Sequence, residues 1–131
     1  LSGEASWAVV EVSSFMMETT SLPADTFEAA AIVNLQEDHL DRHGSVECYH
    51  ALKKKLLTMA KTGACNFDPV RSEPLYAGTW FDNQVLSKNA EAAVFLMRAA
   101  GIGEDVIRQA FREFLPLPHR MNKIATIGAG K

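Results

Sequence analysis

Eight consecutive residues, EDHLDRHG at positions 37–44, concentrate titratable side chains in one short segment of this sequence. The segment holds three acids, two histidines and an arginine, and it follows directly behind the apolar run AAAIVNL at 29–35. Three interpretations compete: a solvated turn, a zinc pair formed by His39 and His43, and a site for magnesium and phosphate. Loops that follow strands are polar by default, so this segment alone leaves all three open.

The neighbouring residues weigh against zinc and favour magnesium. A zinc pair needs both histidines on one helical face and a third ligand nearby. Leu40 stands where a zinc hydrolase carries its general-base glutamate, and Gly44 ends the segment early for such a helix. Magnesium prefers oxygen ligands, and Glu11, an acid within the valine-rich run at 6–14, offers one. Glu11 therefore favours a functional site over a plain turn.

The elements that would position these residues alternate between strands and helices, which predicts the α/β class. The runs at 6–14 and 28–35 read as strands buried on both faces, as in parallel sheets. Ligands bind beyond the carboxyl ends of such strands, so we expect Glu11 and His39 to face one cleft. The other expected elements are a short helix within 15–27 broken by Pro23, a helix from Ser45 to Ala60, a loop with at most a short strand over 62–83, helices over 84–101 and 103–115, and a possible last strand within 116–128.

Composition and charge narrow the possible classes of function. The chain has 131 residues, of which 47% are hydrophobic and 22% charged, as in a single globular domain. A net charge of -3 without a long basic run argues against a nucleic-acid partner. No apolar stretch approaches the length of a membrane span, so we expect no membrane partner. Cys48 and Cys65 lack metal-pair spacing, which favours a reducing cytosol. The chain begins at Leu1, and we expect a piece of a longer protein.

Three segments resemble successive signatures of the Mur ligases, the cytoplasmic ATP-dependent enzymes that build the peptide stem of peptidoglycan. These segments are VVEVSSFMMET, IVNLQEDHLDRHGSVECYHALKKKLL and LPLPHRM. The resemblance is dense over 7–61 and returns over 84–124. It implies part of the family's P-loop-type central domain, with a largely parallel sheet flanked by helices. Phe15 and His119 resemble most the branch of the family that adds D-glutamate.

The resemblance implies roles for the residues at the expected strand ends. Glu11 would bind magnesium, where the residues alone also allow an acid paired with a buried base. His39 would lie at a second magnesium and near the substrate, with Ser13, Asp38 and Arg42 in support. A purely structural His39 is the alternative.

The resemblance also implies roles for three residues on the later elements. Lys53 matches the lysine that the family carbamylates, which would turn an ammonium into an anionic ligand for magnesium and make it catalytic with His39. The residues alone would make Lys53 part of a solvated helix face, and Lys54 and Lys55 keep that interpretation. Asn89 would lie near the adenine and Arg120 at the nucleotide phosphates. The alternative for Asn89 is an ordinary polar residue of a helix. The alternative for Arg120 is a surface salt bridge.

The implied reaction uses ATP and Mg²⁺, with UDP-N-acetylmuramoyl-L-alanine and D-glutamate as substrates. An acyl phosphate forms on the muramoyl-alanine carboxylate, and the amine of D-glutamate then displaces the phosphate. The sequence departs from the family in lacking a phosphate loop, since GAGK at 128–131 does not meet the pattern. We therefore expect residues 1–131 to be a partial central domain, with 62–83 a shortened connection and 121–131 the start of a link to a missing C-terminal domain. The phosphate loop and an N-terminal domain would lie upstream. A non-catalytic remnant or binding module of the same fold is the competing hypothesis.

Overall fold

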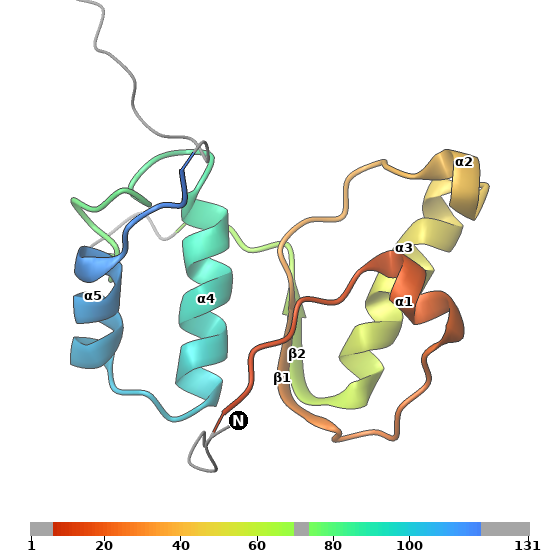
Figure 1. The fold of residues 1–131 in the computed structure, drawn as a ribbon, viewed down its shortest axis with the longest axis horizontal. Helices are drawn as coiled ribbons and strands as arrows, with labels where there is room; N and C mark the ends of the chain where they lie inside the picture. Colours follow the sequence, from red (N-terminus) through yellow and green to blue (C-terminus); the bar gives the residue numbers. More distant parts are fainter. Residues whose placement is uncertain (1–6, 70–73, 119–131) are drawn as a thin grey trace, which may run out of the picture.

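The computed structural model describes residues 7–69 and 74–118. These residues form an α/β fold, in which helices flank a two-stranded parallel sheet, as the sequence predicts (Figure 1). The elements follow one another in this order: α1 (Ser14–Thr19), β1 (Phe27–Ile32), α2 (Leu40–His43), α3 (Val46–Lys55), the 3-10 helix η1 (Leu56–Met59), β2 (Ala60–Cys65), α4 (Ser87–Ala99) and α5 (Glu104–Glu113).

The sheet pairs β1 with β2 in parallel, with Phe27 opposite Ala60 and Ile32 opposite Cys65. Parallel neighbours need a crossover connection, and α2, α3 and η1 supply it. The expected strand at 28–35 is thus confirmed. Its partner falls at the start of a region expected to be loop with at most a short strand, because the sequence AKTGAC has no apolar alternation.

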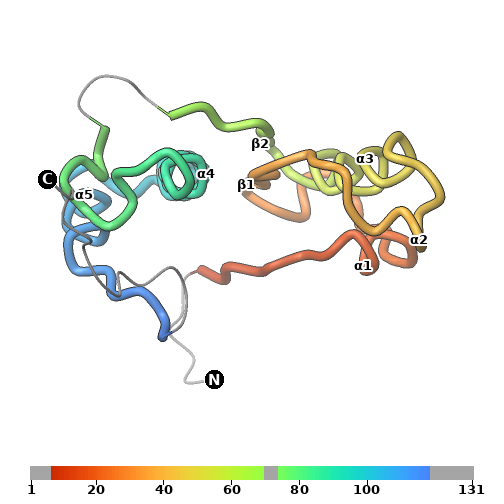
Figure 2. Tube along the Cα trace, turned by 90° about the horizontal axis from the view of Figure 1, so that it is seen from above, coloured from red at the N-terminus to blue at the C-terminus, as the bar shows by residue number. Residues whose placement is uncertain are grey.

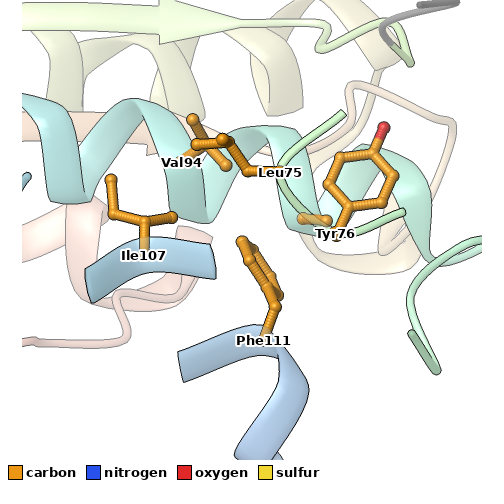
Figure 3. Packing of buried hydrophobic residues seen from close by; sticks show 6 residues of the cluster. Leu75, Tyr76, Val94, Ile107 and Phe111 are labelled. Carbon is orange, nitrogen blue, oxygen red and sulfur yellow. The ribbon is translucent and has the colours of Figure 1, made fainter. Parts of the chain in front are cut away.

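The helices lie on two sides of the strands. Figure 1 shows α4 and α5 on one side and α1, α2 and α3 on the other. On the first side α4 packs against β1, and on the second α1 packs against α3. Figure 3 shows side chains of α4 and α5 converging with two residues of the segment that precedes α4. This buried cluster consists of Leu75, Tyr76, Ala90, Val94, Ile107 and Phe111.

Two serines and a glycine account for the helix boundaries. The hydroxyl of Ser13 accepts from the backbone N–H of Met16, and that of Ser45 accepts from Cys48, so each serine caps a helix as an N-cap residue should. Gly101 follows α4 with a φ of 74°, a conformation that glycine adopts without strain. The expected helices near 15–27, 45–60, 84–101 and 103–115 are confirmed, with slightly shorter bounds.

The predicted strand at 6–14 is wrong in the part that the structure describes. Residues 7–13 run as extended chain, apart from the sheet in Figure 2, and they pair with no described strand. Val9 is 94% exposed instead of buried. A strand exists only when a neighbour bonds its backbone, and the two described strands bond each other. Valine content alone does not supply that neighbour.

Some expectations fall outside the described residues. Arg120, the later part of the possible last strand within 116–128, and the proposed link at 121–131 all lie there. Ser6, at the start of the first predicted strand, and residues 70–73, inside the expected loop, also lie outside. None of the described helices has the length and apolar character needed to cross a membrane.

The buried cluster between α4 and α5 predicts the cost of a core truncation. Ile107 is 0% exposed, whereas its neighbour Val106 is 59% exposed on the same helix. We expect Ile107→Ala to lower the free energy of unfolding by about 2–5 kcal/mol, because lost burial and a residual cavity add together. Urea denaturation monitored by circular dichroism measures the loss. Val106→Ala is the matched control, and an equal loss in both variants would contradict the assignment of Ile107 to the core.

Candidate functional site

A cleft of about 700 Å³ lies between the extended residues 7–14 and strand β1. Clefts of this size commonly hold small ligands. Most of its wall is apolar, but Glu11, Ser13, Asn34 and Lys53 also line it. Asn34 comes two residues after β1, so its backbone marks the carboxyl end of that strand. The cleft thus has polar side chains where a parallel sheet places its ligands.

Lys53 reaches this strand end from helix α3. Its Nζ donates to the carbonyl oxygen of Asn34 at 2.8 Å and lies 3.5 Å from the side-chain oxygen Oδ1 of the same residue. A third acceptor, the hydroxyl of Tyr49, lies 3.4 Å from Nζ. Lys53 is half-buried, so it does not lie on a solvated helix face. The ammonium is held instead over the end of β1.

Glu11 lies in the same cleft wall but is exposed, which corrects the expectation of a buried acid. Among residues 7–69 and 74–118, no strand pairs with the extended segment that carries it. Within the described part of the chain its carboxylate has no ion-pair or hydrogen-bond partner, so an acid paired with a buried base is not found there.

His39 lies at the start of α2 in a left-handed conformation, with φ 52° and ψ 33°. This region is uncommon for residues other than glycine and costs about 1–2 kcal/mol. Asp38 supports the turn, because its Oδ1 accepts from the backbone N–H of His39 at 2.8 Å. Its other oxygen lies 3.5 Å from the Nε2 of the same histidine. Asp38 and His39 are therefore in contact, but neither lines the cleft, so the structure does not place Glu11 and His39 in one cleft as expected.

Arg42 binds Glu18 of α1 through two hydrogen bonds, from Nε to Oε1 at 3.2 Å and from its terminal nitrogen to Oε2 at 2.7 Å. Such forked pairs fix geometry well. The hydrogen bond from Arg42, above all, holds the pKa of Glu18 below its ordinary value, and the same bond raises the pKa of Arg42. Arg42 thus ties α2 to α1.

His43 completes this tie from the buried side, with its side chain only 1% exposed. Its Nδ1 lies 3.2 Å from Oε1 of Glu18, and its Nε2 lies 3.1 Å from the hydroxyl of Ser14. A carboxylate only accepts, so Nδ1 carries the proton, and in the neutral ring Nε2 accepts from Ser14. Both ring nitrogens are therefore engaged.

That engagement removes the zinc alternative. A zinc ligand needs a free ring nitrogen, and His43 would have to give up Glu18 or Ser14 to provide one. The rings of His39 and His43 meet edge to face with centroids 6.5 Å apart. No group of three or more histidine, cysteine, aspartate or glutamate side chains within 7–69 and 74–118 could hold a metal ion.

Of the two expected nucleotide-binding residues, Asn89 lies in the part of the chain that the structure describes. Asn89 is exposed in the first turn of α4 and does not line the cleft. In Figure 1 α4 runs opposite to β1, so its first turn lies towards the carboxyl ends of the strands. Arg120 lies outside the described residues.

The three consecutive lysines of α3 have different environments. Lys54 is exposed, as expected. Lys55 is not on a solvated face, because its Nζ donates to the backbone oxygens of Met17 at 3.1 Å and Thr20 at 2.6 Å. It therefore satisfies carbonyl groups at the end of α1, where a cation also suits the helix dipole.

Sequence reasoning missed the side chains that hold the site together. Tyr49 stands four residues before Lys53, and that spacing on a helix was the available signal. Glu18 and His43 are 25 positions apart, and nothing in the sequence links them. For Asn34, the available signal was a polar residue in the otherwise apolar run AAAIVNL.

Comparison with known proteins finds a matching family. Residues 1–100 match the Mur ligase middle domain. The chain is similar to the UDP-N-acetylmuramoylalanine--D-glutamate ligase of Nitrosospira multiformis, with 32% identity covering 89% of this chain and 33% of that protein. The corresponding ligase of Acidobacterium capsulatum is 28% identical, covering 93% of this chain and 36% of that protein. That of Chromohalobacter salexigens is 43% identical, but over only 56% of this chain and 16% of that protein.

The chain spans about a third of the length of the first two of these curated relatives. No solved structure matches it significantly.

The lowered pKa of Glu18 predicts how stability depends on pH. The folded state holds this carboxylate ionised, so its contribution is complete above the ordinary glutamate pKa of about 4.3. As pH falls below that value the contribution declines, and it is lost once the pH passes the lower folded pKa. Urea denaturation between pH 6 and pH 3 should show a smaller decline for Glu18→Gln than for the unmodified protein. Glu37→Gln, at an exposed acid, is the control and should decline like the unmodified protein.

Proposed function

The chain belongs to the Mur ligase family, and from that premise we propose that the complete protein is an ATP-dependent ligase that forms an amide bond in peptidoglycan precursor synthesis. Mur ligases use ATP and Mg²⁺. The observation that carries the proposal is the polar end of the cleft, where Lys53 and Asn34 meet at the end of β1 and Glu11 lines the same wall. A charged, oxygen-rich strand end suits phosphate and magnesium chemistry.

The specific reaction proposed is the addition of D-glutamate to UDP-N-acetylmuramoyl-L-alanine. The matched relatives carry this specificity in their names, and at about 30% identity it comes to this chain as a proposal. ATP supplies the phosphoryl group that activates the substrate carboxylate, and Mg²⁺ neutralises the charge that gathers there. The neutral amine of D-glutamate would then bond to the acyl carbon and lose one proton to solvent, as phosphate leaves with the electrons of the broken C–O bond.

The residues fit a magnesium ion only if Lys53 changes its charge. As an ammonium, Lys53 is a cation beside the strand end and repels a metal. Addition of CO₂ to its neutral amine, with loss of one proton, would give an anionic carbamate whose oxygens are ligands of the preferred type. Glu11 would supply a carboxylate from the cleft wall, and His39 a ring whose Nε2 lies 3.5 Å from Oδ2 of Asp38. We propose Glu11, His39 and carbamylated Lys53 as the metal-binding and catalytic residues, with Ser13, Asp38 and Arg42 in support.

The nucleotide-binding proposal extends to Asn89 and Arg120. Asn89 lies in the first turn of α4, and this end of the helix lies towards the carboxyl ends of the strands (Figure 1). That position is compatible with an adenine contact. Arg120 rests on the sequence resemblance alone.

We propose residues 1–131 as a partial central domain of this ligase. The phosphate loop and the flanking domains would belong to the two thirds of the relatives' length that the chain does not span. The match to the Nitrosospira relative runs over 161 residues, more than the 131 of the chain, so that relative has additional residues inside the matched region. Residues 62–83 are the proposed position of the shortened connection, and 121–131 the proposed start of a link to a C-terminal domain.

A second candidate function is a non-catalytic remnant or binding module of the same fold. The observation in its favour is that the 131 residues contain no phosphate-loop pattern. The retention of Glu11, His39 and Lys53 together favours the ligase, because a decayed site has no chemical need for all three.

Replacing Lys53 in the complete protein tests the metal-binding proposal. We expect Lys53→Ala to lower kcat by about a hundredfold or more, as does the loss of other groups that stabilise charge in a transition state. ATP-dependent phosphate release in the presence of both substrates measures the rate. Lys54→Ala, at the exposed neighbouring lysine, should leave it unchanged. Equal rates for the Lys53 variant and the unmodified protein would remove Lys53 from the reaction.

A comparison of acceptors tests the amino-acid specificity. With UDP-N-acetylmuramoyl-L-alanine and ATP present, phosphate release should depend on D-glutamate and stay at background with L-glutamate or with diamino acids. Mass spectrometry of the product should show one glutamyl residue added. Release with another amino acid alone would keep the ligase and overturn the D-glutamate proposal. No release with any amino acid would favour the remnant.

A further inference from the structure

We propose that Tyr49 is a positioning residue that fixes Lys53 and His39 relative to each other at the end of β1. This inference rests on the proposed function only where it concerns turnover. The placement of the two side chains is a property of the chain itself, and it is measured without any reaction.

Tyr49 contacts Lys53 in two ways. The two residues stand four positions apart on α3, so their side chains share one helix face. The hydroxyl of Tyr49 lies 3.4 Å from Nζ, and the same Nζ lies 5.2 Å from the centroid of the tyrosine ring. A cation within about 6 Å of an aromatic ring is attracted by its face. Hydroxyl and ring together direct the flexible lysine towards Asn34 and away from solvent.

The ring of Tyr49 also reaches the histidines of α2. Its centroid lies 6.1 Å from that of His39, edge to face, and 5.4 Å from that of His43, in a stacked arrangement. His39 sits in a left-handed turn, so its ring depends on neighbours for its direction. Tyr49 is the residue that touches both His39 and Lys53, which come from different helices.

Burial makes this contact rigid. Tyr49 is 6% exposed, and the His43 ring stacked on it is held by Glu18 and Ser14. A tyrosine with this fixed ring cannot follow Lys53 if the lysine moves, so the lysine conforms to the tyrosine. An ordinary core residue would fill this space equally well without a hydroxyl, and the hydroxyl is directed at Nζ.

Nuclear magnetic resonance of the complete protein with ¹³C-labelled lysine tests the placement directly. In CO₂-depleted buffer Lys53 is unmodified, and its ε-methylene signal, assigned by its loss in Lys53→Arg, should be shifted by the ring current of Tyr49. Tyr49→Leu should move this signal to the position of exposed lysines, whereas Tyr49→Phe should leave it shifted. Exchange of the Nζ protons with water should quicken severalfold in Tyr49→Phe, because one acceptor is lost.

Steady-state kinetics supply the second readout. Tyr49→Phe should lower kcat about tenfold with little change in KM for ATP, because the variant loses the hydroxyl that holds the Lys53 side chain in place before its amine is carbamylated. Tyr76→Phe is the matched control. Tyr76 is also buried, and its hydroxyl donates to Glu91 at 2.7 Å. Tyr76 belongs to the cluster between α4 and α5 and is distant from Lys53 in the sequence. It should change neither the lysine signal nor kcat.

The outcomes separate this inference from the proposed function. If the unmodified protein has no ligase turnover, the function fails, and the lysine signal alone decides the role of Tyr49. A folded Tyr49→Leu variant with an unmoved Lys53 signal overturns the inference, as does unchanged Nζ exchange in Tyr49→Phe. If Tyr49→Leu does not fold, the exchange rate in Tyr49→Phe decides. An equal change of the lysine signal and of kcat in Tyr76→Phe would mean that Tyr49 acts only as an ordinary core residue.

Discussion

The parallel pairing of β1 with β2 is the constraint on which the rest of this structure depends. Because the two strands point the same way, the chain must return across the sheet before β2 begins, and α2, α3 and η1 make that return. The return carries His39 and Lys53 past the carboxyl end of β1. There the free carbonyl of Asn34 meets the amine of Lys53, since a strand end leaves backbone acceptors without a strand partner. The candidate site is thus a consequence of strand direction.

A polar network around the buried His43 then joins the helices beside that site. Glu18 of α1 binds both Arg42 and His43 of α2, and His43 stacks on Tyr49 of α3, so one carboxylate joins three helices. Buried polar groups of this kind are costly unless every partner is present, which makes their arrangement specific. Here the network holds the strained turn at His39 in place. The same network leaves no ring nitrogen of His43 for a metal, which separates the structural histidine from the candidate catalytic one.

The site residues expected from the family have well-defined contacts at the end of β1. The one on the extended segment does not. The match to the Mur ligase middle domain covers residues 1–100, and the described residues within it include Glu11, His39 and Lys53. Lys53 and the α2 residues sit in contacts that fix their directions. Glu11 lies on a segment that pairs with no described strand, with valines exposed beside it. The metal-binding proposal therefore stands on firmer contacts at Lys53 than at Glu11.

The sequence by itself determined the α/β class, the helices other than α2, strand β1 and the concentration of charge behind it, because these follow from periodicity and from local hydrogen bonding. It also determined the family, because the matching motifs lie in order along the chain. Only the tertiary structure decided that AKTGAC pairs with β1, that Val9 and Val10 are exposed, and that Lys55 caps α1 while Lys53 reaches Asn34. Each of these depends on residues distant in sequence. Strand pairing and buried ion pairs are long-range interactions, and no local pattern of residues specifies them.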